Sequence, residues 1–183
     1  MRFTAAGLSI LCLVGRATAQ QEIRLVITKV RREPNTDGAG LSHVSFFNWM
    51  GMEISGVSVS NPGGSSPNEE GPMMLVDAGG VETKWIDINY PLSWRSELVF
   101  TLPFLPNFNQ NPTTLELFTS RDQTKRDPVS WTVDWRDVCG NWSTMATVTN
   151  FAAPTARKAS YTGSSNRFSL SVPAAVDPST CPQ

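Results

Sequence analysis

Residues 119–135 read Thr119-Ser-Arg-Asp-Gln-Thr-Lys-Arg-Asp-Pro-Val-Ser-Trp-Thr-Val-Asp-Trp135. From Val129 onward, every second side chain is apolar and the side chains between are polar. This period of two is typical of a β-strand with one buried face. Pro128 has no backbone N–H to give to a strand ladder, so it suits the first position of the strand. The charged residues before it predict a solvated loop.

Short windows with strand character recur along the whole chain. They are rich in β-branched and aromatic residues and are separated by segments rich in proline and glycine. The windows are 23–30, 43–49, 53–60, 84–89, 97–102, 114–119, 129–135, 144–149 and 167–172. Only a short connection around Gly51 separates 43–49 from 53–60, which predicts a hairpin. Beyond the first residues, no stretch of ten or more has the 3.6-residue period of a helix. The pattern predicts an all-β fold, an antiparallel β-sandwich.

Several short motifs occur in the order found in one family of extracellular modules. They are Asn61-Pro-Gly-Gly64, Leu75-Val-Asp77, Thr83-Lys-Trp85 and Arg126-Asp-Pro-Val-Ser-Trp131, the last followed by Trp142. In these motifs the chain resembles discoidin-like, galactose-binding-type modules, which include the factor V/VIII type C domains. The resemblance implies a jelly-roll sandwich that forms a single domain over residues 20–183. The chain departs from the family at residues 135–140, where a loop of the Gly-Ser-Asn-Asp-Gly type is usual.

The first 19 residues have the features of a secretory signal peptide. Arg2 gives a basic start, residues 8–14 are apolar, and Ala17-Thr-Ala19 has the small-x-small form that signal peptidase cleaves. We expect cleavage near Ala19 and a secreted, extracellular protein; a helix retained in the fold is the alternative. The apolar run is shorter than the roughly 20 residues that span a bilayer, so we expect no membrane span.

Loss of this leader makes the protein more acidic. The whole chain has 15 basic and 16 acidic residues, and removal of Arg2 and Arg16 leaves 13 basic residues and a net charge of −3. Nucleic-acid binding in general needs a basic face that displaces counterions. Nucleic acid is therefore not an expected partner.

Two cysteines remain once Cys12 has left with the leader. In an oxidising compartment, Cys139 and Cys181 are predicted to form a disulfide, with two unpaired thiols as the alternative. Closing such a loop stabilises by about 4 kcal/mol in the chain-entropy model. Asn141-Trp-Ser143 is a glycosylation sequon in the same loop, so Asn141 is a predicted glycan acceptor.

The region 75–85 predicts either a calcium site or a tight turn. Asp77 and Thr83 flank glycines that allow backbone carbonyls to converge, as the oxygen ligands of calcium must. A structural calcium ion at this position is also implied by the resemblance, because similar modules often hold one there. Ala78-Gly79 stands where the family commonly has Gly-Asp, so an ordinary tight turn ahead of a core strand stays open.

Aromatic residues on loops are the candidates for ligand contact. Sugars stack their C–H faces on aromatic rings and direct their hydroxyls to arginine and asparagine. Residues 61–72 form a loop long enough to be functional, whereas Trp85 and Trp131 sit in strand patterns and are predicted in the core. For each candidate, packing at the end of the sandwich is the alternative role. The candidate ligand-binding residues are Trp49, Trp94, Arg95 and Phe108.

The leading functional hypothesis is a non-catalytic module that binds a glycan or glycoprotein. His43 is the single histidine of the chain and lies in a predicted strand without a nucleophile motif, so no catalytic residue is named. One alternative is an adhesive extracellular protein that binds a protein partner. Another is a small glycan-active hydrolase with two carboxylates facing a cleft.

Overall fold

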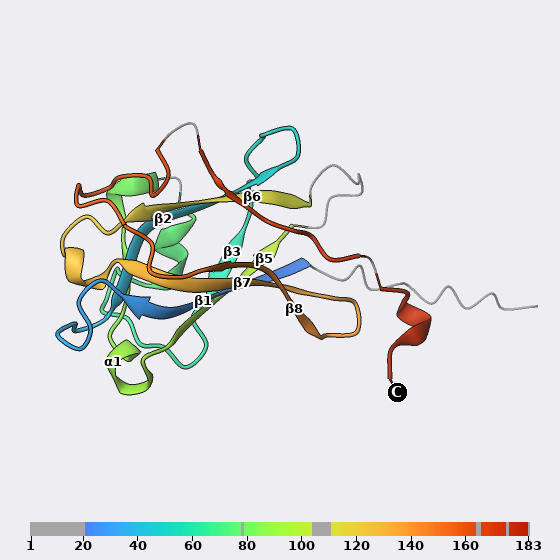
Figure 1. Cartoon of the computed structure of the whole chain (residues 1–183), viewed down its shortest axis with the longest axis horizontal. Helices are drawn as coiled ribbons and strands as arrows, with labels where there is room; N and C mark the ends of the chain where they lie inside the picture. The colour runs from blue at the N-terminus through green and yellow to red at the C-terminus, as the bar shows by residue number, and fades with distance from the viewer. Residues whose placement is uncertain (1–20, 78, 104–110, 164–165, 175, 183) are drawn as a thin grey trace, which may run out of the picture.

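The computed structural model describes residues 21–77, 79–103, 111–163, 166–174 and 176–182. The predicted leader and Phe108 lie outside these residues. Within them, two antiparallel β-sheets pack face to face around one hydrophobic core (Figure 1). The prediction of an antiparallel β-sandwich is confirmed. No helix in the described ranges is long and apolar enough to cross a membrane.

The first sheet has the strand order β3-β5-β1-β7-β8, and the second has the order β4-β2-β6-β9. The strands are β1 (Gln21–Val30), β2 (Ala39–Asn48), β3 (Ser58–Ser60), β4 (Trp85–Asp87), β5 (Ser96–Leu102), β6 (Pro112–Thr119), β7 (Pro128–Arg136), β8 (Trp142–Val148) and β9 (Phe168–Ser169). Short helical turns connect them: α1 (Tyr90–Ser93) and the 3-10 turns η1 (Pro72–Leu75), η2 (Gly80–Glu82), η4 (Thr124–Arg126) and η5 (Pro178–Thr180).

The chain changes sheet at each connection from β1 to β7, as strands do in a jelly roll. The predicted hairpin of 43–49 with 53–60 forms only next to its turn, where the N–H of Ile54 donates to the carbonyl of Phe46, because β2 and β3 belong to different sheets. Gly51, at φ 75°, turns the chain back so that Glu53 bridges to Phe47. Gly56, at φ 74°, turns it again, and Val59 then pairs with β5 across the end of the sandwich. Glycine reaches these positive φ values without a Cβ clash.

β1 lies at the centre of the first sheet, between β5 and β7. Its core-facing Ile23, Leu25 and Ile27 expose 1% of their surface or less, and Val26 on the other face is buried as well. Burial on both faces explains why this strand departs from strict alternation. The prediction that it is an interior strand is confirmed.

β7 supplies the aromatic centre of the core. Trp131 is 1% exposed, and its ring meets those of Phe151, Tyr161 and Phe168 edge to face at 5.2 to 5.9 Å. Edge-to-face packing places the positive rim of one ring against the negative face of the next. Trp85 of β4 is fully buried too, which confirms both tryptophans as core residues. The alternation fades at the end of β7, where Trp135 is only half-buried.

The loop before β7 is not a solvated face throughout, because Asp127 is completely buried. Its carboxylate accepts two hydrogen bonds from the Arg157 guanidinium, at 3.0 and 2.8 Å, and one from Arg31 at 3.3 Å. Arg31 also donates to the carbonyls of Ala153 and Pro154, both at 2.6 Å. This cluster ties the end of β1 and the segment 153–157 to the start of β7.

The C-terminal segment is attached to the sandwich by a disulfide. Cys139 and Cys181 are bonded, with their Cα atoms 5.1 Å apart, so the predicted bridge is confirmed. Beyond Leu170, the described side chains are exposed or half-buried. The last hydrogen bond from this segment to a strand joins the N–H of Ser171 to the carbonyl of Met145, at 3.1 Å.

Candidate functional site

A polar cavity of about 260 Å³ opens where the loop after β3 meets the segment between β4 and β5. We call it the Arg95 pocket. One wall is the Pro62-Gly63-Gly64 turn, and the other comes from α1 and the start of β5. Its lining residues are Pro62, Gly63, Gly64, Asp87, Asn89, Ser93, Arg95, Ser96 and Glu97.

Asp87 holds the two walls of the Arg95 pocket together. It is 2% exposed, and one carboxylate oxygen accepts the backbone N–H groups of Ser65 and Asn89, at 3.1 and 2.9 Å. The other oxygen accepts the Ser96 hydroxyl at 2.5 Å and the amide of Asn61 at 3.4 Å. Four donors from three chain segments stabilise the charged carboxylate in a buried position. Asp87 therefore has a structural role.

The Asn61-Pro-Gly-Gly64 motif shapes the opposite wall. The Asn61 side chain donates to the carbonyl of Glu97 at 2.8 Å, which anchors the loop to β5. A Cβ at position 64 would lie 1.4 Å from the side-chain oxygen of Asn61, so this close approach requires glycine. Asn89 extends the same wall by donating its side-chain amide to the carbonyl of Gly63 at 3.1 Å.

Trp94 stands in the chain between Ser93 and Arg95, which line the Arg95 pocket, but is not itself a lining residue. It ends α1 in the left-handed conformation, at φ 51°, and its N–H donates to the carbonyl of Tyr90 at 2.7 Å. The ring packs edge-on against Tyr90 at 6.0 Å and remains 41% exposed. A positive φ is costly for a bulky residue and is a frequent feature of functional positions.

Arg95 brings a cationic group with several donors to the same place. Half of its side chain is exposed, and one guanidinium nitrogen lies 3.3 Å from a carboxylate oxygen of Glu97. Glu97 is also 3.7 Å from Arg24 on β1. Arg95 retains further N–H groups that can face a ligand, because its guanidinium carries five donors. Of the predicted ligand-binding residues, Arg95 lines this pocket and Trp94 is its neighbour in the chain.

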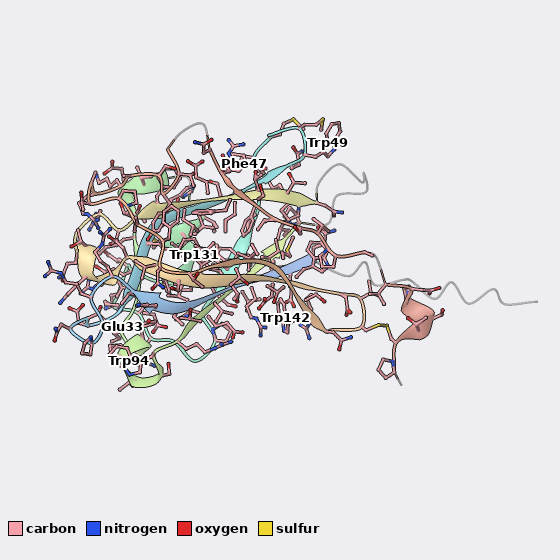
Figure 2. The ribbon with its side chains drawn as sticks, viewed as in Figure 1. Glu33, Phe47, Trp49, Trp94, Trp131 and Trp142 are labelled. Carbon is pink, nitrogen blue, oxygen red and sulfur yellow. A yellow bond between two sulfur atoms is a disulfide. The ribbon has the colours of Figure 1, made fainter. Side chains whose placement is uncertain are left out.

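Trp49 lies elsewhere, at the turn that follows β2, while Trp94 lies on the other side of the molecule (Figure 2). The side chains of Trp49, Met50 and Met52 are 64%, 45% and 54% exposed. The two tryptophans cannot contact one small ligand together. Phe108, the fourth predicted residue, lies outside the described residues.

The predicted calcium-binding residues occupy an oxygen-rich turn. The Thr83 hydroxyl reaches the carbonyl oxygens of Met74 and Gly80, at 2.6 and 2.8 Å, and Asp77 accepts the N–H of Gly79 at 3.2 Å. Among the residues with described positions, no three His, Cys, Asp or Glu side chains gather as metal ligands. A calcium ion here would therefore rely on backbone carbonyls, which suit it chemically. The calcium site stays a prediction.

The predicted glycan acceptor is accessible. Asn141 is exposed in a turn organised by Asp137, whose carboxylate accepts the N–H groups of Cys139 and Asn141, both at 2.8 Å. These bonds lower the pKa of Asp137. The next residue, Trp142, packs between two guanidiniums, with Arg24 4.5 Å and Arg136 5.7 Å from its ring centre. Glycosylation of Asn141 stays a prediction.

His43 contacts a hydroxyl and a carboxylate in an order unlike that of a nucleophilic triad. Its Nε2 lies 2.9 Å from the Ser45 hydroxyl, which donates to Glu53 at 2.7 Å. A triad places the imidazole between hydroxyl and carboxylate so that it can take the proton. Here the hydroxyl is in the middle, and the Nδ1 atom of His43 is buried without a hydrogen bond. Burial lowers the pKa of His43, which keeps the ring neutral.

Asp87, Asn89 and Glu97 line the Arg95 pocket and Asn61 anchors its loop, and none of the four was predicted as a site residue from the sequence. Asparagine in turns and alternating acids in strands are common, so these residues carry no signal of their own. No family model, curated protein or solved structure matches this chain.

Proposed function

We propose that the protein is a secreted, non-catalytic module of discoidin-like type that binds carbohydrate, free or on a glycoprotein, at the Arg95 pocket. The single observation that carries the proposal is a pocket lined by the polar side chains of Arg95, Asn89 and Glu97, with the exposed Trp94 adjacent in the chain to its lining residues. The ordered Asn61-Pro-Gly-Gly64 and Arg126-Asp-Pro-Val-Ser-Trp131 motifs support the discoidin-like type.

A saccharide has the chemistry that this pocket complements. One face of a pyranose carries C–H groups that stack on an aromatic ring, and Trp94, next to Arg95 in the chain, offers such a ring. The hydroxyl groups of the sugar both donate and accept hydrogen bonds. They can accept a hydrogen bond from Arg95 and donate one to Glu97 or to the side-chain oxygen of Asn89. The volume of about 260 Å³ is below the usual range of drug-sized pockets, which favours one sugar unit.

A neutral sugar fits better than an acidic one. Arg95 already has Glu97 as a carboxylate neighbour at 3.3 Å, so its charge is partly compensated. Asp87 is buried with four donors and is thus poorly placed to act as a general acid. For this reason we propose binding rather than hydrolysis.

A glycan array with the mature chain, residues 20–183, tests the proposal. We expect binding to neutral glycans, and a loss of about tenfold or more in Trp94→Ala and Arg95→Ala, since each removes a main contact. Trp49→Ala is the matched control, because it removes an equally large ring far from the pocket. Absence of binding, or equal loss in Trp49→Ala and Trp94→Ala, would refute it.

A second candidate function is adhesion to a protein partner through the turn after β2. The observation that favours it is the exposure of Trp49, Met50 and Met52 on one turn, since aromatic residues and methionine are enriched in protein interfaces. Capture of a protein partner that survives deglycosylation and is lost in Trp49→Ala, while Trp94→Ala retains it, would favour this function.

We also propose a structural calcium ion at the turn that contains Asp77 and Thr83. Support comes from the carbonyls of Met74 and Gly80, which already converge on the Thr83 hydroxyl. Thermal melts in calcium and in chelator test this. An ion that binds only the folded chain raises the melting temperature, and identical melting temperatures would contradict the proposal.

A further inference from the structure

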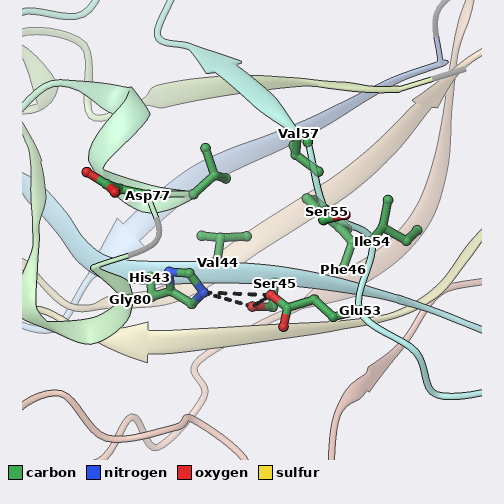
Figure 3. Close-up of a pocket in the computed structure, with 12 residues that line it drawn as sticks. His43, Val44, Ser45, Phe46, Glu53, Ile54, Ser55, Val57, Asp77 and Gly80 are labelled. Carbon is green, nitrogen blue, oxygen red and sulfur yellow. Dashed lines mark hydrogen bonds and ion pairs between the residues drawn. The ribbon is translucent and has the colours of Figure 1, made fainter.

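A larger cavity, of about 450 Å³, lies against β2 and is distinct from the Arg95 pocket (Figure 3). It is bounded by residues 43–46 of β2, by residues 53–57 and by the turn that contains Asp77 and Gly80. None of these residues is used in the proposed glycan site.

The cavity occupies a gap in the hydrogen-bonded edge of β2. On this side β4 pairs with β2 only from Ala39 to Leu41. The chain returns to β2 at Phe46, whose carbonyl accepts the N–H of Ile54 at 2.8 Å. Between these points lie residues 42–45, which no described strand pairs on the β4 side.

The lining residues show that the cavity faces the strand's edge. Val44 lies on the opposite side of the β2 ribbon from His43 and Ser45, yet all three line the same cavity (Figure 3). Since side chains alternate between the two faces of a strand, a cavity touching both sets must approach the strand from its edge. An edge that no strand pairs is a template for another extended chain, and here it is limited to the four residues 42–45, of which Ser42, Val44 and Ser45 expose little surface.

The negative charge of this cavity is that of Glu53, because Asp77 belongs to the turn proposed for calcium, and no lysine or arginine among the described residues pairs with Glu53. Glu53 is 55% exposed, and its ion-pair neighbour among the described residues is His43, at 4.0 Å. Burial lowers the pKa of His43, so the ring leaves the Glu53 charge uncompensated. Asp77 lies on the far side of the cavity, and neither lysine nor arginine is among the described lining residues. Surface acids elsewhere, such as Asp37 and Glu22, have arginine partners at 2.8 and 2.6 Å.

Apolar side chains complete the walls. Ile54 is 7% exposed, and Val57 and Val76 are half-buried around the cavity. A cationic head on an aliphatic stem matches this combination, because the stem contacts the valines and isoleucine while the head reaches Glu53.

We propose that this cavity binds the lysine or arginine side chain of an extended segment of a partner protein, which pairs with the edge of β2. The complementary charge selects the basic side chain, and the unpaired edge selects a polypeptide over a free amine. This site is independent of the glycan proposal.

Synthetic peptides test the proposal on the full mature chain by fluorescence anisotropy. The probes are an alternating Thr/Val heptapeptide with a central arginine, the same peptide with neutral citrulline, the arginine peptide with N-methylated backbone, and free butylguanidine. We expect the arginine peptide to bind about tenfold more tightly than the citrulline peptide. Glu53→Gln should abolish that difference, whereas the matched control Glu69→Gln, an exposed acid outside the cavity, retains it.

Four results would overturn the proposal. They are equal binding of the arginine and citrulline peptides, no binding of either at about 1 mM, an undiminished arginine preference in Glu53→Gln, and equally tight binding of the N-methylated peptide. Butylguanidine binding as tight as that of the arginine peptide would assign the cavity to a small amine and overturn the pairing with β2. The urea midpoint of Glu53→Gln is measured alongside, and an unchanged midpoint shows that the variant is folded.

Discussion

Replacing Asp127 with asparagine would remove the charge from the cluster that precedes β7. The side chain is completely buried and accepts three guanidinium hydrogen bonds, so Asp127→Asn leaves Arg31 and Arg157 facing each other without a counterion. Breaking a buried ion pair by removing one partner costs about 3 to 5 kcal/mol. Both arginine side chains keep 22% of their surface in water, which places the expected loss at the lower end, about 3 kcal/mol.

The structure provides a matched control for this experiment. Asp37 also receives a two-point contact from one arginine, Arg126, at 2.8 and 2.9 Å, but its side chain is 47% exposed. Solvent weakens such a pair, so Asp37→Asn should cost less than about 1 kcal/mol. Urea unfolding followed by tryptophan fluorescence gives both free energies of unfolding. Equal losses of unfolding free energy in the two variants, or a loss below about 1 kcal/mol in Asp127→Asn, would show that burial does not determine how much this carboxylate stabilises the fold.

Other parts of the molecule lead to separate expectations. Burial lowers the pKa of His43, so His43 binds a proton more readily in the unfolded chain than in the folded protein. The free energy of unfolding therefore has its full value above the ordinary pKa of 6.5 and declines as the pH falls below it. Urea unfolding at pH 7, 6 and 5 should show this decline in the wild type and a smaller one in His43→Gln, and parallel curves would contradict it. Replacing Cys139 and Cys181 with serine should cost about 1 kcal/mol rather than about 4. Closing the loop in the unfolded chain stabilises the fold by about 4 kcal/mol, but in the folded protein the same bond also restrains the exposed segment after Leu170, which offsets about 3 kcal/mol of that gain. A loss near 4 by the same assay would mean that the segment packs firmly without the bond. Gly64→Ala should cost about 2 kcal/mol or more and weaken glycan binding, because its Cβ collides with the anchored side chain of Asn61 in the same turn. Gly71→Ala, where a Cβ meets no atom within 4 Å, is the control, and an equal urea midpoint for both variants would refute the collision.

The fold class was predictable because strand periodicity is a local signal. The alternation from Val129 onward gave β7, and burial of Trp85 and Trp131 followed from their place in such patterns. The hairpin prediction is right only next to the turn, because connection length does not show whether the chain then changes sheet. Gly56, whose positive φ redirects the chain, looks like any other turn glycine in the sequence.

Long-range partners explain what the sequence could not show. Asp127 looks like part of a charged loop until Arg31 and Arg157 are brought to it from distant segments. The candidate site likewise has some residues that the sequence could identify and others that it could not. Trp94 and Arg95 were identifiable from their chemistry, whereas Asp87 acquired a role only when the loop after β3 came to rest beside it.

The position of β1 has a consequence for synthesis of the chain. This apolar strand is the first of the described strands to be made, yet its neighbours begin at Ser96 and Pro128. Pairing of segments so distant in the sequence is slow, and an apolar strand whose two edges remain unpaired during that time is prone to aggregate. A nascent chain that stops short of β7 leaves β1 with one edge open, so chaperone binding to this strand during synthesis would protect the yield of native protein.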